Sequence, residues 1–88
     1  MNETCLLEHL EDIARRLGVE LRYENLCQGL VRSEGGYCRL AGKPMILLNR
    51  RDSRDQKIRV LCKSLRKLDL QGIFIPPAVR KVLESRNN

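Results

Sequence analysis

Aromatic and histidine side chains are scarce in this chain. Its 88 residues contain no tryptophan, a single histidine, His9, and three other aromatic residues, Tyr23, Tyr37 and Phe74. Proteins that bind unpaired bases of nucleic acid stack them on aromatic side chains, so the sequence supports this mode of binding poorly. His9 has no evident partner that would tune it for acid-base catalysis.

The cysteines do not have the spacing of a metal site. Four are present, 22, 11 and 24 positions apart, at Cys5, Cys27, Cys38 and Cys62. Structural zinc sites use closely spaced ligand pairs, and the sequence has no C-x-x-C pair. We therefore expect no metal, no cofactor and no disulfide, with the thiols acting as small apolar side chains.

Long apolar runs are also missing. The longest run near the middle of the chain, Met45 to Leu48, has four residues, whereas a membrane-spanning helix needs about 18 or more. The first residues are acidic early and have a broken apolar pattern, unlike a secretory signal peptide. We expect no membrane contact, a cytoplasmic location and one domain over residues 1–88.

Positive charge is concentrated in the second half of the chain. The formal net charge is +6, with six lysines and arginines against seven acidic residues in 1–44, and eleven against four in 45–88. This excess is compatible with an acidic partner or nucleic acid, although charged helix faces are usually only solvated. Nucleic acid is therefore an alternative partner that we do not favour.

The first helix is predicted over residues 4–17. Apolar side chains recur there three and four positions apart, and Gly18 suits the end of a helix. With Thr4 as the N-cap, Cys5 lies in the first turn, where the positive end of the helix dipole favours a thiolate.

Two further helices have clear starting signals. Ser53 and Gln56 form a capping box that begins a second helix, and its apolar face continues to Leu68. Proline suits the first turn of a helix, so a third helix is predicted from Pro77 to about Glu84.

The strands lie between the first and second helices. Residues 19–24 alternate between apolar and charged, which predicts a half-exposed strand. Residues 25–36 lose the pattern and predict a loop, with an irregular strand around Leu30 to Arg32 as an alternative within it. Residues 37–40 and 45–49 flank a short connection, Ala41 to Pro44, and predict a hairpin. The sequence therefore predicts an α+β fold with a small antiparallel sheet of about three strands, packed by two or three helices in the order α-β-β-β-α-α.

Three cations of the second helix form a candidate partner-binding surface. Arg59, Lys63 and Arg66 are spaced four and three positions apart, on a flank of the apolar face. A basic helix of this kind can lie along a phosphate backbone, but no base-reading group accompanies it. Nucleic acid binding would then be weak and independent of sequence.

The C-terminal part carries a candidate dimer interface. Ile73, Phe74 and Ile75 are consecutive and precede two prolines that fix the direction of the chain. A small core leaves some apolar surface uncovered, and two-fold dimers are the commonest solution. We expect a homodimer through these three residues.

Parts of this pattern resemble the core of the ImmA/IrrE-type zinc peptidases. The segments Gly18 to Leu21 and Ile46 to Asn49 are similar to two strand regions of that family, and the resemblance covers about residues 4–68. It implies a zincin-like core. The segment Ile75 to Arg80 is also similar to a stretch of small bacterial proteins that have no known activity.

The signature of the peptidases is absent from the matching helical turn. That family carries H-E-x-x-H there, but this chain has Lys63 and Lys67 in place of the two histidines and Ser64 in place of the glutamate. Protonated lysines are poor zinc ligands. The resemblance therefore implies a zincin-like core, without the metal site.

These observations favour a non-enzymatic interaction or regulatory module with a protein partner that the sequence does not identify. Two alternatives stay open: weak nucleic acid binding through the basic C-terminal half, and a peptidase-like enzyme whose metal motif has been lost or replaced.

Overall fold

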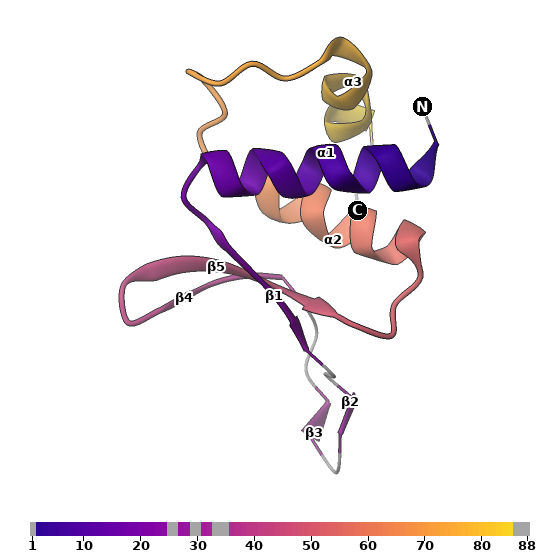
Figure 1. Cartoon of the computed structure of the whole chain (residues 1–88). Helices are drawn as coiled ribbons and strands as arrows, with labels where there is room; N and C mark the ends of the chain where they lie inside the picture. The colour runs from indigo at the N-terminus through magenta and orange to yellow at the C-terminus, as the bar shows by residue number, and fades with distance from the viewer. Residues whose placement is uncertain (1, 25–26, 29–30, 33–35, 86–88) are drawn as a thin grey trace.

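The computed structural model describes residues 2–24, 27–28, 31–32 and 36–85 and places helices on one face of a small sheet (Figure 1). The elements follow in the order α1 (Glu3–Arg16), β1 (Glu20–Glu24), β2 (Cys27–Gln28), β3 (Val31–Arg32), β4 (Gly36–Leu40), β5 (Lys43–Asn49), α2 (Arg54–Leu65) and α3 (Pro77–Ser85). The predicted α+β class and the order of the helices around the sheet are confirmed.

The main sheet is mixed, not wholly antiparallel as predicted. Its strand order is β1-β5-β4, with β5 antiparallel to β4 but parallel to β1. The alternation in residues 19–24 shows which side of β1 is buried but carries no information about its neighbour. β4, at the opposite edge of the sheet, runs opposite to β1, and the hairpin reverses the chain again, so β1 and β5 run in the same direction.

The hairpin between β4 and β5 is tighter than predicted. Leu40 pairs with Lys43, so the turn has only two residues, Ala41 with a φ of 54° and Gly42 with a φ of 79°. Two positive φ values give a turn whose twist matches that of the flanking strands. Pro44, predicted to be part of the connection, belongs to β5.

A second, two-stranded sheet lies in the region predicted to be a loop with an irregular strand around residues 30–32. β3 falls within that predicted strand, whereas β2 was not predicted. β2 pairs antiparallel with β3, and Gln28 lies opposite Val31. The rest of residues 25–35 falls outside the described part of the chain.

The two long helices differ in how well their starts were predicted. α2 begins as expected, because the Gln56 backbone N–H donates to Ser53 Oγ at 3.2 Å. α1 begins at Glu3, because its cap is Asn2, two residues before the predicted cap Thr4; Asn2 Oδ1 accepts from the Cys5 N–H at 2.8 Å. Cys5 still lies in the first turn and is exposed.

One apolar core joins the layers. α1 packs over β1, α2 packs over β4 and β5, and α3 lies against both helices on the side away from the sheet (Figure 1). The buried residues of this cluster are Leu6, Leu10, Ile13, Ala14, Val19, Ile46, Leu48, Ile58, Leu61, Cys62, Leu65, Ile75, Val79 and Leu83. Across the described residues, no helix has the length and hydropathy needed to cross a membrane.

Candidate interaction surface

The three residues of the predicted dimer interface lie in different environments. Phe74 is 72% exposed, Ile73 is partly buried against the core, and Ile75 is only 3% exposed. Ile75 therefore belongs to the interior of the monomer, and the prediction that it contributes to a contact between copies is corrected. The continuous patch expected from sequence is reduced to one prominent aromatic side chain.

Phe74 is held by anchored neighbours on both sides. Before it, the Gln71 N–H donates to Asp69 Oδ1 at 3.0 Å and closes a small turn, and Gly72 has a φ of 93°. After it, the buried Ile75 leads to Pro76, whose carbonyl accepts the first hydrogen bonds of α3. A side chain presented by a fixed backbone loses little conformational entropy on binding.

The three cations proposed as a binding surface on α2 have separate roles. Arg59 Nε lies 3.0 Å from Asp55 Oδ2, one turn away, and Lys63 is exposed. Arg66 Nε donates to the carbonyl of Leu83 in the last turn of α3, where a cation is favourable. Arg66 thus joins α2 to α3. Its Nη2 is buried and has no hydrogen-bond partner among the described residues.

The turn that resembles the zinc-binding helix combines two exposed lysines with a buried serine. Lys63 and Lys67 are exposed, whereas Ser64 between them is 2% exposed and donates its hydroxyl to the Val60 carbonyl at 2.7 Å. The position of the missing glutamate therefore faces the core. No group of three possible metal ligands occurs in the part of the chain that the structure describes.

A polar cluster between α1, β1 and α2 was not foreseen from the sequence. The Tyr23 hydroxyl donates to Glu11 Oε2, and Lys57 Nζ lies 5.5 Å from the centre of the Tyr23 ring, a cation-π contact. Arg50 Nη2 donates to the Tyr23 carbonyl at 3.2 Å. The three elements meet only in the folded chain, so no local pattern indicates this cluster.

Burial raises the pKa of Glu11 above its ordinary value. Loss of hydration is the main cause and nearby Glu8 adds to it, while the positive charges of Arg15 and Lys57 oppose it. The folded chain therefore favours protonated Glu11. Its contribution to folding stability is fully present below the pKa of the unfolded chain and is lost as pH rises through the higher pKa of the folded chain.

Glu11→Gln should therefore stabilise the fold at neutral pH. The amide keeps an acceptor for the Tyr23 hydroxyl and removes the charge that is costly to bury. We expect a higher denaturant midpoint than wild type at pH 7 and no difference at a pH below the carboxyl's unfolded value of about 4.3. Glu8→Gln, at an exposed position one turn away, is the matched control and should shift the midpoint less. A lower midpoint for Glu11→Gln at pH 7 would contradict the assignment.

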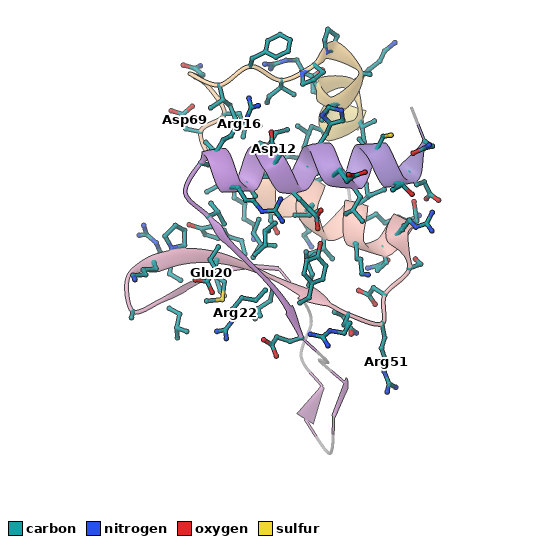
Figure 2. All side chains as sticks on the ribbon, in the orientation of Figure 1. Asp12, Arg16, Glu20, Arg22, Arg51 and Asp69 are labelled. Carbon is teal, nitrogen blue, oxygen red and sulfur yellow. The ribbon has the colours of Figure 1, made fainter. Side chains whose placement is uncertain are left out.

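A shallow hollow lies on the outer side of α1. Its cavity volume is about 370 Å³, and Cys5, Glu8, His9 and Asp12 line it. Asp12 already forms an ion pair with Arg16, at 2.9 Å (Figure 2). Among the described residues, those lining the hollow do not form a group of three possible metal ligands.

Comparisons with models of protein families, with curated proteins and with solved structures find no match to this chain. The resemblance to ImmA/IrrE-type peptidases therefore stays a prediction. The site must be judged from its own geometry.

Proposed function

We propose that this chain is a non-enzymatic interaction module of the cytoplasm that works as a homodimer and binds a partner protein through Phe74. The exposure of Phe74 carries the proposal. It is the only phenylalanine in the sequence and is 72% exposed, between the partly buried Ile73 and the buried Ile75. Aromatic side chains that enter a pocket of the partner are typical anchors of protein interfaces.

Charge indicates the chemistry of the partner. Arg80 and Lys81 are exposed on α3, the helix that follows Phe74, and the second half of the chain has a large excess of cations. A protein surface with an apolar pocket and an acidic rim would complement both features.

We also propose that the chain has no enzyme activity, for two reasons. The turn that would hold the peptidase motif has exposed lysines at two positions and a buried serine between them. The polar cluster of Glu11, Tyr23 and Lys57 is held together by its own contacts: Tyr23 donates to Glu11, and Lys57 lies over the Tyr23 ring.

Site-specific crosslinking in cells tests the proposal. A photoreactive phenylalanine analogue at position 74 should form adducts with one partner protein, and the same analogue at Ala78, exposed on α3, should form fewer. Phe74→Ala should weaken the purified complex about tenfold or more, equivalent to at least about 1.4 kcal/mol.

Lys63→Glu separates the alternatives. It should leave the protein adducts unchanged, because Lys63 lies on α2 and not in the Phe74 segment. Adducts to nucleic acid that disappear in Lys63→Glu would refute the proposal and support nucleic acid binding through the basic half. Equal adduct formation at positions 74 and 78 would refute the role of Phe74.

A further inference from the structure

β4 offers an open edge. Among the described strands it pairs only with β5, on one side. The other edge strand, β1, carries Arg22 between Glu20 and Glu24, with which it pairs at 3.5 and 3.7 Å (Figure 2 labels Glu20 and Arg22). Charges along an edge discourage pairing with another strand. By contrast, only one of the five residues of β4, Arg39, is charged, so the edge of β4 is less protected against pairing than that of β1.

The hairpin fixes which backbone groups of β4 point outward. Leu40 and Lys43 close the two-residue turn and form its hydrogen-bonded pair. Such pairs alternate along an antiparallel ladder, so the next pair, Arg39 with Pro44, is not hydrogen-bonded. Pro44 has no N–H to donate, which agrees with a pair that has no hydrogen bonds. The N–H and C=O groups of Arg39 and Tyr37 therefore face away from β5, and no backbone hydrogen bond to them occurs among the described residues.

We propose that β4 pairs antiparallel with β4 of a second copy, with Cys38 on the two-fold axis. The sequence of β4 is complementary to itself in this register. Tyr37 of each copy lies opposite Arg39 of the other, and these two pairs would exchange four backbone hydrogen bonds. The guanidinium would lie beside the tyrosine ring, a favourable cation-π arrangement.

The outer positions of β4 also fit. In the same register Leu40 lies opposite Gly36 of the second copy. Leu40 is 59% exposed, and a side chain built on Gly36 would meet nothing within 4 Å. The leucine of one copy would fill the space left by the glycine of the other, and both apolar surfaces would lose contact with water.

The size and charge of this interface set its expected strength. Two five-residue strands give a contact in the small, transient class of interfaces. α2 packs over β4, so the exposed Lys63 of each copy, which belongs to α2, lies on the same face of the joined sheet, and the two lysines repel. The dimer should therefore form at micromolar concentrations and tighten as salt screens this repulsion.

This inference rests on the proposed homodimer, and disulfide trapping tests the surface. A Cys5→Ser, Cys27→Ser variant keeps Cys38 and the buried Cys62. In a pair without hydrogen bonds the two Cα atoms are about 4.5 Å apart, within the range of a disulfide. Diamide, which accepts the two thiol hydrogens, should produce a covalent dimer from this variant. Cys38→Ser in the same background should give none.

Arg39→Pro provides the second test, with light scattering as the measurement. The substitution removes an N–H that points away from β5, so β4 and β5 should stay paired while the second copy is excluded. We expect a folded monomer, and Arg39→Ala should dimerise more weakly than wild type but still crosslink through Cys38. If Arg39→Pro does not fold, the crosslinking results decide.

The outcomes separate the two proposals. A wild type that stays monomeric at high micromolar concentration refutes both the homodimer and this register. A dimer that is not trapped through Cys38 and survives Arg39→Pro refutes the β4 surface but leaves the homodimer standing.

Discussion

Ile75→Ala should lower the free energy of unfolding by about 2–5 kcal/mol, whereas Phe74→Ala, one residue away, should change it by less than about 0.5 kcal/mol. Ile75 is 3% exposed and packs in the core with Val79 and Leu83 of α3, so its truncation leaves a cavity. Phe74 is 72% exposed and contributes little to folding. Urea unfolding of the two variants at low protein concentration, where dimers do not contribute, makes the comparison.

This pair of variants also tests how the C-terminal segment works. If both substitutions destabilised the monomer equally, Phe74 would be part of the core and could not serve as an anchor for a partner. If neither substitution lowered the free energy of unfolding, Ile75 would not be packed between α3 and the other two helices, which would contradict the structure.

Ser64→Glu should destabilise the fold by roughly 3 kcal/mol or more, because it places a carboxylate without a partner at a site that is 2% exposed. A domain of this size has a total stability of roughly 4–13 kcal/mol, so a large part of the protein would unfold. The measurement is the denaturant midpoint at neutral pH. Lys63→Glu at the adjacent exposed position is the control and should change stability by less than about 0.5 kcal/mol.

Ser64→Glu bears on the resemblance to the zinc peptidases. A glutamate in a metal-binding turn faces an open, water-filled site, whereas Ser64 donates its hydroxyl to the Val60 carbonyl inside the domain. If Ser64→Glu proved as stable as wild type, this turn would be open to water. That result would support the alternative of a peptidase-like enzyme whose metal motif has been replaced. The expected loss of stability instead supports a module in which α2 has a packing role.

Several features were predictable because their causes lie within a few residues along the chain. Ser53 and Gln56 fixed the start of α2, since a cap acts over one turn, and Pro77 fixed the start of α3. The alternation in β1 predicted its half-exposed pattern, with Leu21 and Tyr23 turned toward the core. The cap of α1 was misplaced because Asn2 and Thr4 are both good caps, and only the observed hydrogen bond to Cys5 distinguishes them.

The candidate surfaces were only partly predictable. The exposed cations of α2 were located, but the contact of Arg66 with the Leu83 carbonyl depends on where α3 lies. The alternation of hydrogen-bonded pairs around Pro44 could have indicated which backbone groups of β4 face away from β5, once the two-residue turn was known, but the position of β4 at the edge depends on the sheet order. Residues that share an apolar run, such as Phe74 and Ile75, look alike in sequence and differ only in what covers them.

The amino-acid sequence by itself therefore determined the presence of the helices and of the hairpin and the alternation of β1, because helix and strand periodicity are local properties. The length of the hairpin turn and the cap of α1 were settled by the structure. Only the tertiary structure decided that β1 runs parallel to β5, that Glu11, Tyr23 and Lys57 meet, and that Ile75 is buried while Phe74 is exposed. These features depend on contacts between segments far apart in the chain, and their geometry is set by the packing of α1, α2 and α3 on the sheet as a whole.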